Sequence, residues 1–214
     1  MNSLLERARD FLLPSRKKFA EDPFGYSLSA WHKWGLLREA SGFPVDLEAF
    51  PDSEELKSPV LWLTHAHAIS EAAQVVIRSE PRFSAMPDVF KGVCDSQYCA
   101  VGLMLVGYSL EVCLKAMLII QKGVPAYSQD EKAHSHHRLE ELAEFVPGLS
   151  DKDKAILRTL THFVTWAGRY PDPGGGREAK VAEIFSQSEG FQICARDLFD
   201  LATRVMGHAK TVIG

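Results

Sequence analysis

The stretch Ala100-Val-Gly-Leu-Met-Leu-Val-Gly-Tyr-Ser-Leu-Glu-Val-Cys-Leu-Lys-Ala-Met-Leu-Ile-Ile-Gln-Lys122 decides the fold of this chain. It is long and apolar enough to span a bilayer, but Glu111 and Lys115 lie in its middle. Amphipathic patterns elsewhere in the sequence predict helices that could cover it. We therefore expect residues 100–122 to form the buried core helix of a bundle, and we expect no membrane partner.

Helical signals continue on both sides of this stretch. Ser58-Pro59 is typical of a helix start, and Ser150 begins a capping-box pattern. The helix after Ser150 should end before Pro171, because the residue that precedes a proline disfavours helix. No alternating run of apolar and polar residues indicates a strand. Further helices are expected at 58–79, 150–169 and 189–210.

These patterns predict an all-α protein, an antiparallel helical bundle with an N-terminal helical appendage. We expect residues 1–57 to form the appendage with its connector, and residues 58–214 to form the bundle. Glycine, proline and acidic residues mark 41–57 as the connector, and a run rich in glycine and proline marks 171–177 as a flexible loop.

The composition is that of an ordinary globular protein of 214 residues, 46% hydrophobic and 24% charged. Its formal net charge of −4 argues against broad, nonspecific binding of nucleic acid through phosphates, but not against a local basic site. The four cysteines lack C-x-x-C spacing, which favours a reducing, cytoplasmic location. Cys113 and Cys194 fall within apolar helical patterns and are expected to be buried.

The helix expected at 150–169 has a polar face that carries Arg158, His162 and Arg169. Arginine binds phosphate oxygens in a bidentate manner, and histidine transfers protons near neutral pH. This face is therefore a candidate site for phosphodiester chemistry, with Arg158 and His162 as candidate catalytic residues and Arg169 as a phosphate- or nucleotide-binding residue. The alternative is a solvated face that lies opposite a core stripe.

Two other helices offer candidate phosphate- or nucleotide-binding residues. Arg204 and His208 lie one helical turn apart on the last helix, where alternating acids and bases otherwise indicate surface ion pairs. On the core helix, Lys115 follows Glu111 at the favourable spacing for an ion pair. That pair either fixes the register of the bundle or forms the polar end of a ligand pocket.

Histidines gather at 134, 136 and 137, and His67 and Glu71 are neighbours on the helix after Pro59, with Arg78 further along. Ser135 is interpreted as the N-cap of the next helix. No metal or cofactor is expected, because no further ligands follow at zinc-site spacing. A metal-assisted hydrolase that uses these histidines with His162 is the weakest alternative.

Three segments of the second half belong together. They are Gly107-Tyr-Ser-Leu-Glu-Val-Cys-Leu-Lys-Ala-Met-Leu118, His137-Arg-Leu139 at the start of the next helix, and Gly168-Arg-Tyr-Pro171 at the end of a later one. The first looks like the LExxLKA helix of HEPN domains (higher eukaryotes and prokaryotes nucleotide-binding), and the second is similar to their His-x-Leu segment. The resemblance covers roughly residues 95–212, with Glu111 and His137 as structural polar residues.

The resemblance implies a helical bundle, commonly a homodimer, of a family that includes ribonucleases of toxin–antitoxin and phage-defence systems and inactive RNA or nucleotide binders. Active members carry Arg-x4–6-His on a late helix. Here only three residues separate Arg158 from His162, and Arg204 from His208.

We therefore expect a HEPN-like protein that associates with RNA or a nucleotide and acts in stress or phage defence. It would be either a divergent ribonuclease that needs no metal or an inactive one. An antitoxin-like protein is the expected partner. If RNA is cleaved, His162 would transfer the proton while Arg158 and Arg169 hold the scissile phosphate. The alternative is a non-catalytic helical protein-interaction or dimerisation module.

Overall fold

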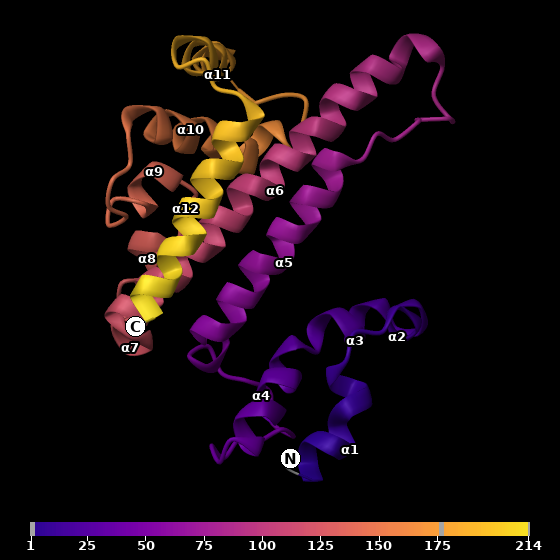
Figure 1. Ribbon diagram of the computed structural model, residues 1–214, viewed down its shortest axis with the longest axis vertical. Coiled ribbons are helices and arrows are strands. Elements are labelled where there is room, and N and C mark those ends of the chain that lie inside the picture. Colours follow the sequence, from indigo (N-terminus) through magenta and orange to yellow (C-terminus); the bar gives the residue numbers. More distant parts are fainter. Residues whose placement is uncertain (1–2, 176–177, 214) are drawn as a thin grey trace. The chain divides into compact units, whose positions relative to one another are not determined.

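A computed structural model describes residues 3–175 and 178–213, which are helical apart from loops and turns and contain no strand. The structure is 73% helical, so the prediction of an all-α fold is confirmed. The chain divides into two compact units, Met1–Leu61 and Trp62–Gly214 (Figure 1). The division falls in the first turn of a helix, shortly after the boundary expected at residue 57.

The first unit consists of short helices joined by polar caps. Ser15 accepts a hydrogen bond from the backbone nitrogen of Lys18, and Asp22 accepts one from Gly25, as N-cap residues do. Trp31 is buried, with 6% of its surface exposed. The helices are α1 (Ser3–Leu12), α2 (Arg16–Glu21), α3 (Pro23–Leu28), α4 (Ala30–Ala40) and the short 3-10 helix η1 (Glu55–Lys57).

The second unit is built around one helix of 35 residues, α6 (Asp88–Lys122). It starts earlier than the predicted residue 100, because Pro87 forms its N-cap and no helix-breaking residue follows. Its buried residues all lie between Gly102 and Ile119, within the predicted core stretch. By length and composition α6 could cross a membrane, but 72% of its most apolar window is buried inside the protein.

The other helices of the second unit follow the predicted pattern in part. The helix expected at 58–79 is present, and the helix expected at 189–210 starts only at Ala195 because residues 191–194 form a turn and loop. A separate helix, α11, was not expected. The elements are α5 (Pro59–Arg78), α7 (Val124–Gln129), α8 (Glu131–His134), α9 (Leu139–Leu142), α10 (Asp151–His162), the π-helix η2 (Phe163–Ala167), α11 (Glu178–Gly190) and α12 (Ala195–Ile213).

Two local predictions are wrong. Cys194 is exposed, because it lies in the loop before α12 rather than on the helix, whereas Cys113 is buried as expected. Ser135 is not an N-cap: it ends α8, and its hydroxyl donates to the carbonyl of Lys132. The residue before α9 is Arg138, which makes no side-chain capping bond.

The capping box at Ser150 is present in full, with Asp153 as its second member. The helix that it starts changes to π geometry from Phe163, where the Gly168 amide donates to the Phe163 carbonyl at 3.2 Å. Gly168 lies so close to α6 that a Cβ atom would be 2.4 Å from that of Met104. The π turn therefore places Gly168 where the chain comes closest to α6.

Contacts around α6 fix the directions of its neighbours. Gly107 of α6 faces Leu160, and Met104 faces Gly168, so α10 and η2 run opposite to α6. Gly102 faces Ile77 at the far end of α5, which also runs opposite. Figure 1 shows α12, which packs against α6, running in the same direction as α6. Three helices thus cover the core helix on different sides.

The close approach at Gly107 makes a testable prediction. A Cβ atom there would be 2.7 Å from Val164 Cγ2 and 3.2 Å from the Leu160 carbonyl oxygen, which belongs to the backbone. We expect Gly107→Ala to lower the free energy of unfolding by about 1–3 kcal/mol through overpacking. The matched control is Gly92→Ala on the same helix, where the space is open; its better helix propensity should stabilise by up to about 1 kcal/mol. Equal effects of the two changes in urea denaturation would contradict the packing.

Candidate functional site

The two candidate catalytic residues of α10 are each paired with side chains of other elements. Arg158 donates to Oε1 of Glu140 on α9 at 2.7 Å and to Oε1 of Gln187 on α11 at 3.4 Å. His162 lies on the same side, 3.4 Å from a carboxylate oxygen of Glu183 on α11. The fold therefore brings both side chains together, but it occupies each with a partner from this chain.

The surroundings of His162 also set its protonation. Burial lowers its pKa below the ordinary value, the Lys180 ammonium lowers it further, and the Glu183 carboxylate opposes both. The imidazole is thus neutral near pH 7 and suited to accept a proton rather than to donate one. Its ring packs edge-on against Trp166, with the ring centroids 6.5 Å apart. His162 and Trp166 are both buried, at most 9% exposed as residues, so substrate access is narrow.

Arg169 lies beyond the end of the π-helix and makes no ion pair within the part of the chain that the structure describes. It borders a hollow of about 240 Å³ together with Gln97 of α6 and the neighbouring Tyr170, whose side chain is 61% exposed. Unlike Arg158, this arginine is available to a ligand.

Arg204 and His208 do not form a common site. Arg204 holds both carboxylate oxygens of Asp153 on α10, one of them at 3.1 Å. Burial alone would raise the pKa of Asp153, but hydrogen bonds from Arg204 and Ser150 outweigh it and lower that pKa. His208 instead pairs with Thr211 of its own helix at 2.9 Å. Arg204 therefore ties α12 to the capping box of α10.

Glu111 and Lys115 form a buried ion pair on α6, and the more exposed His137 contacts the same carboxylate. Lys115 Nζ lies 2.8 Å from Glu111 Oε1, and both residues are at most 8% exposed. His137 Nδ1 lies 3.0 Å and 2.9 Å from the two oxygens of the same carboxylate. The imidazole comes from the segment between α8 and α9, so the cluster anchors that segment to the core helix.

The histidines of the second unit do not converge. His134 Nε2 lies 2.8 Å from Lys122 Nζ, and His136 Nε2 lies 3.7 Å from Glu141. His137 and His162 have the carboxylate partners already described. Within residues 3–175 and 178–213, no group of three or more histidine, cysteine, aspartate or glutamate side chains could hold a metal ion. The geometry thus gives the metal-assisted alternative no site.

The residues that the sequence analysis missed are the partners of Arg158 and His162. Glu183 and Gln187 lie on α11, and Glu140 lies on α9. The helical spacing of the apolar residues Val181, Ile184 and Phe185 between two glycine-containing segments was the available signal for α11.

Comparison with protein-family models finds no match, and no curated protein or solved structure matches the chain at a significant level.

The buried pair on α6 can be tested by comparing the loss of one charge with the loss of both. Glu111→Ala leaves the Lys115 ammonium buried without its carboxylate, so we expect the free energy of unfolding to fall by about 3–5 kcal/mol. The double change Glu111→Leu with Lys115→Met removes both charges and should recover most of that loss. The control is Lys91→Ala, which breaks an exposed pair with Asp88 on the same helix; about 1 kcal/mol or less is expected. A double variant no more stable than Glu111→Ala would contradict the interpretation.

Proposed function

We propose that this chain is a non-catalytic, HEPN-like helical interaction module that assembles as a homodimer. One observation carries the proposal: Arg158 and His162 are each occupied by side chains of α9 and α11. An arginine that already binds a carboxylate has fewer donors and less uncompensated charge to offer a scissile phosphate. The separation of the two residues by three positions, instead of four to six, points the same way.

The proposed interface is the N-terminal part of α6, before the helix becomes buried. Val89, Phe90 and Val93 are 80%, 51% and 55% exposed, and their spacing places them on one side of the helix. Asp88, Lys91 and Asp95 fall on the other side by the same geometry. An exposed apolar face is stable in an interface when the partner surface is also uncharged. In a two-fold dimer the same face of a second copy is that partner surface.

A single charge placed in this face should separate the two copies. We expect the wild-type chain to be a dimer at micromolar concentration and Val93→Asp to weaken dimerisation at least about tenfold, because a carboxylate would be buried without a partner. Light scattering after size-exclusion chromatography measures both.

The control for this experiment is Phe185→Asp, which introduces the same charge at an exposed hydrophobic residue of α11. It should leave the dimer intact. A wild-type monomer, or a Val93→Asp variant that remains dimeric, would reject this interface. A dimer that forms only with a second protein would favour an antitoxin-like partner on the same face.

A second candidate function, contact with single-stranded RNA or a nucleotide, is favoured by Arg169 and Tyr170. The guanidinium has no acidic partner among the described residues, and the exposed ring beside it offers a stacking surface. Phosphate contacts from arginine and base stacking on aromatic rings are the usual elements of such binding. Under this second proposal the protein associates with RNA in the cytoplasm without cleaving it.

This second candidate has its own test. We expect no cleavage of mixed RNA without added metal, by wild type or by the double variant Arg158→Ala, His162→Ala. Tyr170→Ala should weaken binding of a labelled oligoribonucleotide by about fivefold or more, since stacking on an aromatic ring contributes about 1–3 kcal/mol per base. The control is Arg196→Ala, which removes an exposed charge on α12 and should change binding little. Cleavage that the double variant abolishes would restore the ribonuclease hypothesis, and wild type that binds no RNA would reject this candidate.

A further inference from the structure

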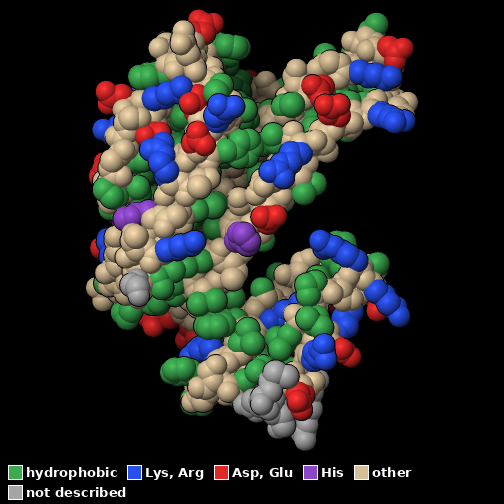
Figure 2. Space-filling view, in the orientation of Figure 1, with side chains coloured by type: hydrophobic (Ala, Val, Ile, Leu, Met, Phe, Trp, Pro, Cys, Tyr) green, Lys and Arg blue, Asp and Glu red, His purple; other side chains and the backbone are tan. Residues whose placement is uncertain are grey.

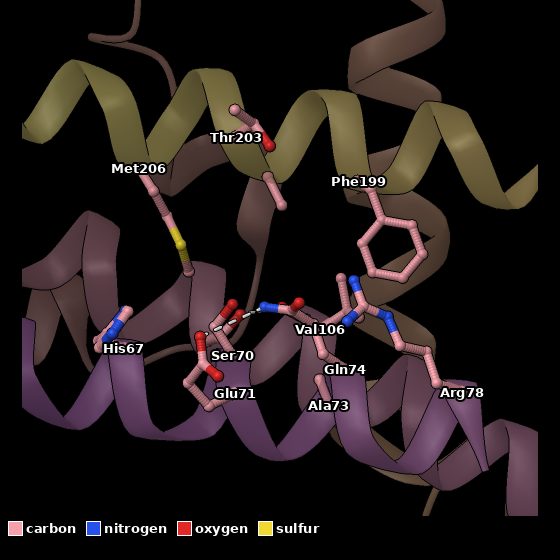
Figure 3. Close-up of a pocket in the computed structure, with 12 residues that line it drawn as sticks. His67, Ser70, Glu71, Ala73, Gln74, Arg78, Val106, Phe199, Thr203 and Met206 are labelled. Carbon is pink, nitrogen blue, oxygen red and sulfur yellow. Dashed lines mark hydrogen bonds between the residues drawn. The ribbon is translucent and has the colours of Figure 1, made fainter.

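A pocket of about 380 Å³ lies between α5, α6 and α12, away from both surfaces considered above. Its size is that of a small-molecule site. Figure 3 shows Phe199 and Met206 pointing from α12 toward α5, one at each end of the pocket. Ala73 and Val106, which are 2% and 3% exposed, line its inner side. The apolar floor of the pocket can therefore contact the middle of a ligand.

Polar side chains of α5 form the rim of this pocket. His67, Glu71, Gln74 and Arg78 follow one another at intervals of four, three and four residues, so they share one face of the helix. In Figure 2 a histidine, an acidic and a basic side chain follow one another along α5, beside hydrophobic side chains where α12 approaches. Gln74 is half-buried and the other three are exposed, so this stripe lies at the mouth of the pocket.

The charged members of the rim are unpaired within the described part of the chain. Glu71 has one weak contact, a hydrogen bond of 3.5 Å from Gln74, and neither His67 nor Arg78 has an ion-pair partner there. In contrast, Arg158 and Arg204 each bind a carboxylate. An arginine and a glutamate that line one pocket without pairing with each other present two separate charges to a ligand.

The positions of the two charges along the pocket indicate which ligand would fit. Arg78 lies at the Phe199 end of the pocket, and Glu71 lies further along α5 toward His67 and Met206 (Figure 3). Seven residues of helix separate them, which corresponds to about 10 Å along the axis at 1.5 Å per residue. A complementary ligand carries an anionic group at one end, a cationic amine at the other and an apolar body between them.

We propose that this pocket binds a small zwitterionic ligand, with its carboxylate or phosphate against Arg78 and its amine against Glu71. His67 adds a second hydrogen-bond acceptor one helical turn from Glu71. The site requires neither the dimer nor RNA binding, so it goes beyond both functions proposed above.

The probes are ω-amino carboxylates of six to ten carbon atoms, measured by titration calorimetry on the whole chain. We expect one chain length to bind best, and octanoate and octylamine, which each lack one charged group, to bind at least about tenfold more weakly. Amino-alkyl phosphates of the same lengths distinguish a phosphate from a carboxylate as the anionic group. No binding of any ω-amino carboxylate or phosphate at millimolar concentration, or equal binding of octanoate, would overturn the proposal.

Two conservative variants test the orientation. Glu71→Gln should abolish the preference for 8-aminooctanoate over octanoate, whereas Arg78→Gln should abolish its preference over octylamine. A variant that fails to fold would lose binding of all three probes, 8-aminooctanoate, octanoate and octylamine. It would not lose one preference while it keeps the other. Glu80→Gln and Arg82→Gln, in the exposed segment after α5, are the matched controls and should change neither ratio. Preferences that survive in both pocket variants would reject the assignment.

Discussion

The burial of α6 between Gly102 and Ile119 is the constraint on which the rest of the second unit depends. A helix that is apolar on nearly every side must be covered on every side. Here α5, α10 with η2, and α12 cover it, and three glycines allow the closest approaches: Gly102 and Gly107 on α6 itself and Gly168 after the π turn. The Glu111–Lys115 pair lies within this covered region, so its charges need a further partner, which His137 supplies from outside the long helices. One buried carboxylate thus positions the segment that leads into α9.

The same covering explains where function is expected. Elements that close around the core bring their own acids, and these acids bind the basic side chains that the sequence offers for phosphate chemistry. Arg204 is held by the capping-box carboxylate of α10, and Arg158 by Glu140 of α9. Side chains that the packing leaves free lie elsewhere: on the first turns of α6, beyond the π-helix, and in the pocket between α5 and α12. Binding surfaces are therefore better supported by this arrangement than a catalytic centre on α10.

Local signals in the sequence predicted what depends on local interactions. The starts of α5 and α10 follow from Ser58-Pro59 and from the capping box, and the core stretch is buried as its composition indicates. The early start of α6 was missed because the apolar pattern of Val89, Phe90 and Val93 is only about two turns long and stands apart from the core stretch. Cys194 was misplaced because a periodic pattern was continued across a loop. The partners of His162 could not be predicted, since they depend on how α11 folds back onto α10, which is a tertiary contact between segments separated by a glycine-rich loop.

The weak attachment of α11 has a consequence for the motions of the molecule. None of its described side chains is buried, and its links to α10 include the contacts of Gln187 and Glu183 with Arg158 and His162. Segments with few buried apolar groups open at a small fraction of the free energy of global unfolding, and their amide hydrogens exchange early. The backbone amides of α11 should therefore exchange well before those of α6. Such an opening would release Arg158 and His162 from their partners on α11 together.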